Sequence, residues 1–269
     1  MTRYLGMHLR SLITNPYLIF WSVLFIEFWI IMWAYVFGGY IPPIEEAVRD
    51  YTATAYGTLV ILSLSGAAVT IASSLLHSSK SIRYVTKYTR LSPSRFLFEN
   101  LVSSVLALLV LCVVMFASVI TVFTIRFGMF PLPVSPMGLV FAMFTGALFM
   151  YALAFFLNVS MVVLRAGRSA SFISFVPLLL GFLPYFSLWV DFGAAVYVSP
   201  FNCLTSLCYY FFSGKAAPTG GYLISTTKTF VDLNLVLLSL SAWLAMLIAM
   251  DILLLKKMRG IGVEEIRTT

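Results

Sequence analysis

The sequence predicts an all-α integral membrane protein with six transmembrane helices, an N-terminal amphipathic surface helix and an outer re-entrant helical hairpin before the last span. Of its 269 residues, 61% are hydrophobic and 10% are charged, whereas soluble domains carry roughly 25% charged residues. A helix of about 20 apolar residues crosses the hydrocarbon layer. We therefore expect residues 1–269 to form a single transmembrane domain, with no soluble domain.

The N-terminal segment, residues 1–16, has the pattern of a helix lying on the cytoplasmic membrane surface. Leu5, Leu9, Leu12 and Ile13 recur at helical spacing, which places them on one face. Asn15-Pro16 then interrupts the helix, because proline disfavours helix in the residue before it. The first span is expected from Tyr17 to Phe37. This run is longer than the apolar region of a signal peptide and lacks a cleavage motif, so we expect no cleavable signal.

The remaining apolar runs predict five further spans, at 52–76, 99–125, 137–164, 171–190 and 233–255. Small residues crowd the second of the six spans and indicate close helix packing. Within the expected outer loop, 191–232, the segment 199–213 is too short to cross. A re-entrant hairpin buried in protein is expected there.

The distribution of positive charge predicts the orientation. Thirteen of the 17 lysines and arginines fall on the side of the N-terminus. Basic residues concentrate on the cytoplasmic side of membrane proteins, so both termini, including the tail 256–269, are expected in the cytoplasm. The thirteen are Arg3, Arg10, Lys80, Arg83, Lys87, Arg90, Arg95, Arg165, Arg168, Lys256, Lys257, Arg259 and Arg267.

Several chemistries are excluded by missing motifs. A phosphate-binding loop needs G-x-x-x-x-G-K-[ST], but Gly214-Lys215 is followed by Ala216. The two histidines, His8 and His77, are isolated and make no metal site. No Gly-x-Ser-x-Gly sequence occurs, so no catalytic residue is expected and the chain is predicted not to be an enzyme. Nucleic-acid binding is also not expected, because the positive charge lies in short loops between spans.

Two further residue groups favour structural roles. Glu45, Glu46 and Asp50 faintly resemble the acidic residues of intramembrane proteases, but the required histidines are missing, so we expect a solvated acidic loop. Cys112 is expected to be a packing residue. Cys203 and Cys208 lie five positions apart near the outer face, and a disulfide between them is left open.

Glu27 lies near the middle of the first span, where a charged residue costs at least about 2.5 kcal/mol on insertion scales. It must face another helix, a second protomer or a wet cavity, or stay protonated. We expect that Glu27 either lines a translocation route, locks an interface, or is a protonated structural carboxyl. Pro177, Gly181 and Pro184 in the fifth span are candidates for a bend that acts as a gate.

The cytoplasmic loop 77–98 carries five basic residues, Lys80, Arg83, Lys87, Arg90 and Arg95, and leads through Pro93 into the third span. Spacings of three and four residues place the first four on one helical face. Binding of membrane lipid headgroups alone would explain these charges. The sharper interpretation is a short cytoplasmic helix that docks on a partner protein.

Four short sequences, in this order, resemble the ABC type-2 transporter permease family across nearly the whole chain. They are Thr14-Asn15-Pro16 before the first span, Arg90-Leu91-Ser92-Pro93-Ser94-Arg95 after the basic loop, Val198-Ser199-Pro200-Phe201-Asn202-Cys203-Leu204-Thr205 on the outer side, and Lys256-Lys257-Met258-Arg259 at the end. The loop is uniformly basic where the family often carries acidic residues, and the outer proline is shifted to Pro200.

The resemblance implies an exporter in the plasma membrane, built from two permease chains and two cytosolic ATPase subunits that bind ATP and Mg²⁺. No cofactor is expected on this chain. Arg83, Lys87, Arg90, Pro93 and Arg95 would couple it to the ATPase partner, and the route would follow the interface with a second permease copy or paralogue. Two alternatives stay open: an ion-gradient-driven secondary transporter or channel using Glu27, and a scaffold that transports nothing. The cargo is not specified.

Overall fold

A computed structural model describes the backbone of residues 2–88, 93–163, 170–222 and 229–258, and the side chains of residues 4–74, 97–163, 172–222 and 229–254. Within these ranges the regular secondary structure is helical, joined by turns and irregular segments that include two isolated β-bridges. The helices are α1 (Thr2–Ile13), α2 (Pro16–Ile19), π-helix η1 (Phe20–Leu24), α3 (Phe25–Ile31), π-helix η2 (Met32–Val36), 3₁₀-helix η3 (Phe37–Tyr40), α4 (Glu45–Tyr88), α5 (Pro93–Phe127), α6 (Pro136–Val163), α7 (Ala170–Ser174), α8 (Val176–Gly181), α9 (Leu183–Phe186), 3₁₀-helix η5 (Gly193–Val198), α10 (Pro200–Ser213) and α11 (Leu233–Met258).

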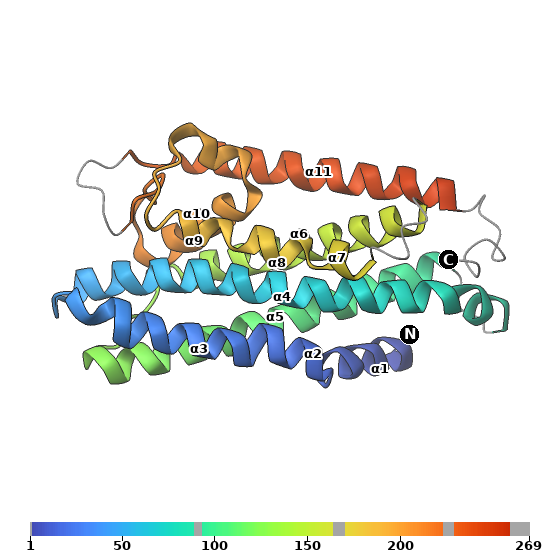
Figure 1. The fold of residues 1–269 in the computed structure, drawn as a ribbon, viewed down its shortest axis with the longest axis horizontal. Helices are drawn as coiled ribbons and strands as arrows, with labels where there is room; N and C mark the ends of the chain where they lie inside the picture. The colour runs from blue at the N-terminus through green and yellow to red at the C-terminus, as the bar shows by residue number, and fades with distance from the viewer. Residues whose placement is uncertain (1, 89–92, 164–169, 223–228, 259–269) are drawn as a thin grey trace.

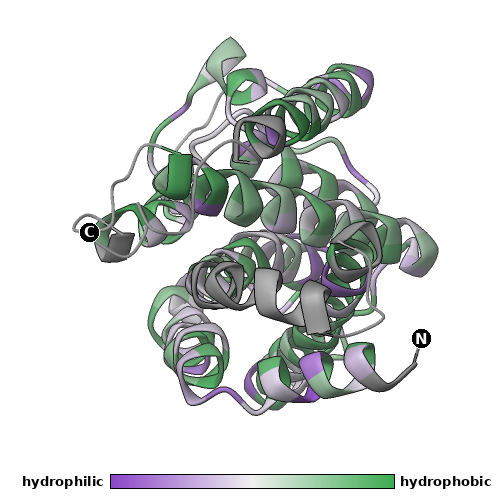
Figure 2. Ribbon diagram, turned by 90° about the vertical axis from the view of Figure 1, so that its right-hand side faces the viewer, coloured by the Kyte–Doolittle hydropathy of each residue, from purple (hydrophilic) through white to green (hydrophobic). Residues whose placement is uncertain are grey.

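Five helical stretches in the described chain are long and apolar enough to cross a membrane, which confirms the helical membrane class. They are Pro16–Tyr40, Glu45–Ser74, Leu97–Phe127, Pro136–Val163 and Leu233–Leu254. Large apolar side chains also remain exposed on their outer faces, including Phe28, Phe141 and Leu238. Figure 2 shows the same apolar colouring on peripheral helices as on central ones. A lipid environment stabilises such surfaces, which water would not.

The expected fifth span, 171–190, differs from a continuous crossing helix. The described part is a shorter apolar helical segment, Phe172–Phe186, interrupted at Phe175 and at Phe182. Pro177 and Pro184 each fall in the first turn of the helix that follows a break. Proline lacks a backbone N–H and is tolerated there, but not inside a helix. The helix is therefore interrupted next to both prolines, and their role as a gate stays a prediction.

Helix α4 is the centre of the fold. Every residue of its most apolar stretch is buried, compared with 28% for the first span and 22% for α11. In Figure 1 it runs along the length of the molecule, with α1–α3 and α5 on one side and α6, α10 and α11 on the other. Glycines allow its neighbours to approach: a Cβ on Gly57 would lie 3.1 Å from the Thr205 carbonyl oxygen. The prediction that small residues pack this span is confirmed.

The boundaries near the predicted loops need correction. Helix α4 begins at Glu45, seven residues before the expected start of the second span, and continues to Tyr88. Helix α5 begins at Pro93, so most of the expected loop 77–98 continues these two helices. The start of α1, the end of α4 and the end of α11 lie at one end of the molecule, and the turns at 41–44 and 128–135 lie at the other.

The segment expected to be re-entrant contains one helix, α10, of 14 residues. Ser199 caps it, with its hydroxyl accepting a bond from the backbone N–H of Asn202 at 3.3 Å, and Gly214 ends it with a left-handed backbone (φ 76°). Nearly every side chain of α10 is buried, and it packs against α4 and α6. Helix α10 itself is thus covered by protein, whereas Trp189, Val190 and Val198 in the segment before it are exposed.

Candidate functional site: the first span and a cavity beside the start of α4

The first span is fastened to α4 through two of its backbone carbonyls. The hydroxyl of Ser63 donates to the carbonyl of Ser22, and the hydroxyl of Tyr51 donates to that of Trp33, each at 2.7 Å. Both acceptors lie in π-helical turns, where the regular helical bonding pattern is displaced. Two side chains of α4 thus hold the first span at the places where its own helix is irregular.

Helices α8 and η1 both pack closely against α4, at two adjacent residues of that helix, Ser65 and Gly66. A Cβ on Gly181 would lie 2.5 Å from the hydroxyl oxygen of Ser65, and a Cβ on Gly66 would lie 2.9 Å from the Trp21 carbonyl oxygen. Distances this short leave no room for a side chain at either glycine. The first span, α4 and the broken segment α7–α9 are therefore packed backbone to backbone at this level.

Aromatic rings connect the first span directly to the broken segment. The rings of Trp21 and Phe175 meet edge to face at 5.9 Å, and those of Trp29 and Tyr185 at 5.3 Å. Trp189 continues the row, 5.0 Å from Tyr185. Edge-to-face pairs add roughly 0.5–1.5 kcal/mol each beyond their burial. A shift of α8 and α9 would be transmitted to the first span through these rings.

Glu27 is half-buried on α3, in the same span. Within the described part of the chain its carboxyl has no hydrogen-bond or ion-pair partner. Its neighbours Leu24, Phe28 and Ile31 are exposed. The expectation that Glu27 bonds to another helix of the same chain is therefore not met. A second protomer, a wet route or a protonated state remains for this group.

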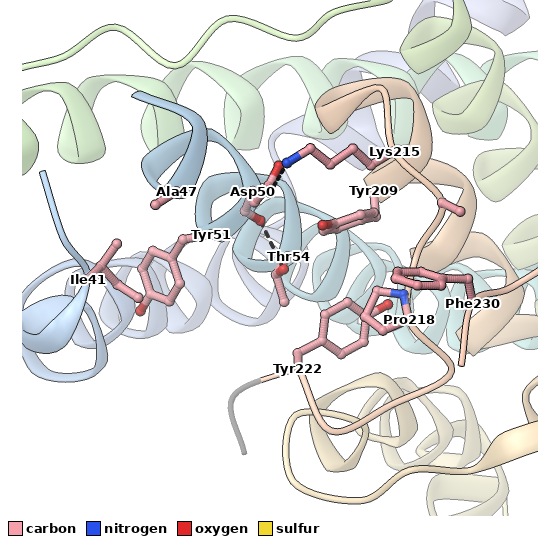
Figure 3. Close-up of a pocket in the computed structure, with 11 residues that line it drawn as sticks. Ile41, Ala47, Asp50, Tyr51, Thr54, Tyr209, Lys215, Pro218, Tyr222 and Phe230 are labelled. Atoms are coloured by element: carbon pink, nitrogen blue, oxygen red, sulfur yellow. Dashed lines mark hydrogen bonds and ion pairs between the residues drawn. The ribbon is translucent and has the colours of Figure 1, made fainter. Parts of the chain in front are cut away.

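At the opposite end from the termini, a cavity of about 370 Å³ opens beside the start of α4. Figure 3 shows Asp50, Lys215 and Tyr209 meeting there, with Tyr222 below them. The ammonium of Lys215 lies 2.6 Å from Oε1 of Glu46 and 2.6 Å from Oδ2 of Asp50. Hydrogen bonds to Asp50 and Glu46 raise the pKa of Lys215 above its ordinary value.

This pairing corrects the sequence-based view of the acidic segment. Glu45 and Glu46 lie in the first turn of α4 rather than in a solvated loop. Glu46 and Asp50, one turn apart, share the ammonium of Lys215, which follows α10. A surface pair of this kind contributes little stability by itself, but it links the start of α4 to the segment after α10.

Helix α1 docks on α5 at the end where the termini begin. The side chains of Asn100 and His8 lie 3.1 Å apart, and Tyr151 of α6 donates to Oδ1 of Asn100 at 3.3 Å. Burial lowers the pKa of His8, which favours the neutral imidazole. Of the predicted apolar stripe, Leu12 is buried and Leu5 and Leu9 are half-buried, whereas Ile13 is exposed.

The structure describes some of the remaining predicted site residues and not others. Pro177, Gly181 and Pro184 are buried in the broken segment, next to α4. Arg83, Lys87 and Arg95 lie outside the residues whose side chains the structure describes, as does Pro93, and Arg90 lies outside the described backbone. Docking through these five stays a prediction.

The structure shows the oxidation state of the three cysteines. Cys112, Cys203 and Cys208 are buried free thiols. Cys203 and Cys208 both lie in α10, where helical geometry keeps residues five positions apart from meeting. The disulfide alternative is therefore wrong in this structure. The described residues also hold no cluster of histidine, cysteine, aspartate and glutamate suited to a metal.

Two charged groups escaped the sequence reasoning. Asp251 is an acidic residue inside the last span, and the rule that singled out Glu27 would have found it. Lys215 carried no such signal, because its partner Asp50 is 165 positions away.

The fold and these contacts define a helical membrane protein built around one buried central helix. Compared with protein-family models, with curated proteins and with solved structures, the chain has no match.

Proposed function

We propose that this chain is the transmembrane permease subunit of an ATP-driven ABC exporter in the plasma membrane, with both termini cytoplasmic. Two permease chains would form the substrate route, and separate cytosolic subunits would hydrolyse ATP with Mg²⁺. The resemblance in the four sequence segments supports the family. The absence of a phosphate-binding loop in the sequence supports a separate ATPase, since the chain then needs an outside source of energy.

One observation supports the proposal most strongly. One side of the first span is hydrogen-bonded to α4, and the other side is exposed. Ser63 and Tyr51 hold its inner side to α4, while Phe28 and Ile31 are exposed on its other side next to the unpartnered Glu27. A route shared with a second chain would cover this face and give the carboxyl a partner or water. A lone subunit leaves it against lipid.

A mechanism follows from the row of rings. Closure of the ATPases on ATP would push on the helix around Arg83 and Lys87 and on α1. The two ends of α4 are one continuous helix, so displacement would reach Ser65 and Gly66, and through them α8 and the first span. ATP moves this equilibrium only by binding the two states with different affinity.

The direct test is a mild-detergent purification of the tagged chain from its native membrane, followed by mass spectrometry. A protein with a G-x-x-x-x-G-K-[ST] loop is expected in near one-to-one ratio. Charge reversal at Arg83 and Lys87 is expected to release that protein, with reversal at Arg126 on the opposite end as the matched control. Recovery of the folded chain without any ATPase would contradict the proposal.

The alternative with an observation behind it is a gradient-driven secondary transporter. Glu27 has no partner in the described chain and lies within a span, as a proton-carrying carboxyl would. In vesicles free of ATPase, this alternative expects transport driven by a pH gradient and its loss in Glu27→Gln. The exporter proposal expects no flux under those conditions.

A further inference from the structure

A second cavity, of about 240 Å³, lies on the flank of the molecule between α5, α6 and α11. Its lining is apolar except for Tyr151 and Asp251. The other lining residues are Leu97, Phe98, Leu101, Leu148, Ala152, Phe155, Ile248 and Ile252. Phe98 and Ile252 are about half exposed at its rim, so the cavity is open sideways, on a flank that the hydrocarbon of a membrane would cover.

Asp251 gives this cavity its chemistry. The residue is only 8% exposed, and its Oδ1 accepts no hydrogen bond from any described residue. A carboxyl in such a place is costly unless it is paired. Among the described residues of the wall, the only other polar side chain is Tyr151, and its hydroxyl already donates to Asn100.

Aromatic rings line the same space. Phe98, Tyr151 and Phe155 face the cavity, and the rings of Tyr151 and Phe155 stack with centroids 6.0 Å apart. Ring faces attract cations, and several rings together form the cages that bind ammonium groups. A buried carboxylate with three rings therefore selects a cation and rejects an anion.

The rest of the wall selects an apolar body. Leu97, Leu101 and Ile252 offer only hydrocarbon, which favours the chain of an amphiphile. A metal ion would find one carboxylate here and, among the described lining residues, no other oxygen than the Tyr151 hydroxyl, which is too few for Mg²⁺ or Ca²⁺.

We propose that this cavity binds a single-chain amphiphile with an ammonium headgroup, the headgroup resting on Asp251 within the three rings and the hydrocarbon chain leaving between α5 and α11. The site is separate from Glu27 and from the cavity beside Asp50 and Lys215. It does not depend on the exporter proposal, because it would bind the ligand in the isolated chain.

The test uses the full chain in nanodiscs of phosphatidylglycerol, which carries no amine. The probe is a twelve-carbon primary amine with a photoreactive diazirine on its chain close to the amine, and the matched probe is the corresponding alcohol. Labelled peptides are mapped by mass spectrometry. The amine is expected to label the stretches 97–101 and 248–252, and the alcohol to label them at least about tenfold less, as loss of a charge-assisted bond implies.

Two variants decide the outcome. Asp251→Asn removes the charge, and Ile252→Trp covers the opening from an exposed position where folding is not at risk. Both are expected to lower amine labelling to the level of the alcohol, while Glu27→Gln, the other unpaired carboxyl in a span, keeps it. Equal labelling by amine and alcohol, or unchanged labelling in both Asp251→Asn and Ile252→Trp, would overturn the proposal.

Competition with unlabelled amphiphiles distinguishes the possible sources of the ligand. Displacement of the probe by added lysophosphatidylethanolamine, which has an ammonium headgroup and one acyl chain, would support the proposal with a membrane lipid as occupant. Displacement by dodecyltrimethylammonium alone would support it with a free cationic amphiphile. Displacement by neither, at concentrations that saturate the membrane, would count against an ammonium site.

Discussion

Gly181 lies against Ser65 so closely that a Cβ on the glycine would come within 2.5 Å of the serine hydroxyl oxygen. This contact joins the broken segment α7–α9 to the buried central helix. At Gly66, the next residue of α4, a Cβ would come within 2.9 Å of the carbonyl oxygen of Trp21. Any movement of α8 must therefore be accommodated by α4 or by the first span.

Gly181→Ala is expected to lower the free energy of unfolding by about 1–3 kcal/mol, the range for overpacking a filled site. Thermal unfolding in detergent measures it. The second substitution Ser65→Gly should restore stability by vacating the space. Gly39→Ala is the matched control, since nothing lies within 4 Å of a Cβ there. Equal loss in the control would show that the close contact is not the cause.

Tyr51→Phe removes the hydrogen bond to the Trp33 carbonyl and keeps the ring. The hydroxyl is buried and the bond is 2.7 Å long, so we expect a loss of about 0.5–1.5 kcal/mol in unfolding free energy. Hydrogen exchange at η2 should rise in the same variant. Thr121→Val is the control, because the Thr121 hydroxyl bonds only to its own helix. Unchanged exchange at η2 would mean that Tyr51 does not hold the first span.

Lys215→Met is expected to release the outer end of α4 at a cost of about 0.5–1 kcal/mol, because the side chain is 42% exposed and solvent screens the pair. A double-mutant cycle with Asp50→Asn isolates the coupling. The pKa of Lys215 is raised from 10.5, so its stabilisation is complete below that pH and is lost as the pH rises through the higher folded value. Coupling that is unchanged in 1 M salt would contradict a screened pair.

His8 makes the free energy of unfolding depend on pH on the acidic side, whereas Lys215 does so on the basic side. Burial lowers the pKa of His8 below 6.5, so the unfolded chain takes up a proton first as the pH falls. The contribution is therefore complete above about pH 6.5 and is lost progressively below it. His8→Gln should flatten the dependence of melting temperature on pH between 5 and 7. An identical slope in the two proteins would refute this assignment.

The open face of the first span predicts a contact between two copies. In a background in which the three native cysteines are replaced by serine, Phe28→Cys is expected to form a disulfide-linked dimer on mild oxidation in membranes. Leu238→Cys, equally apolar and exposed on α11, is the control and should stay monomeric. Dimers from Leu238→Cys and none from Phe28→Cys would move the interface to the other side of the molecule.

Sequence patterns predicted the local features of the fold well, for reasons that lie within a few residues. Proline removes an N–H wherever it occurs, so the break at Asn15-Pro16 and the bend near Pro177 and Pro184 were readable. The lengths of apolar runs predicted four of the spans closely, because hydrocarbon thickness sets them. The described helical stretch Phe172–Phe186 is shorter than the span expected at 171–190. The loop expected at 77–98 was wrong for the most part, since hydropathy does not register helices that extend beyond the apolar layer.

The candidate site depended much more on contacts between distant residues. The sequence singled out Glu27 because a charged residue within a span has a high free-energy cost. Only the tertiary structure could show whether another helix of the chain pairs with it. Lys215 pairs with Asp50 across 165 positions, and no local pattern encodes that distance. The irregular π turns at Ser22 and Trp33 likewise depend on donors from α4.

The amino-acid sequence by itself determined that this protein is helical and apolar enough for a membrane, where proline interrupts its helices, and which polar residues are costly. These properties follow from composition, proline and periodicity, which act over a turn or two of helix. Tertiary structure alone decided that α4 is the buried centre, that Gly181 meets Ser65, and that Asp251 ends in an aromatic cavity without a partner. Those outcomes depend on which helices pack together, and packing is decided by the whole chain at once.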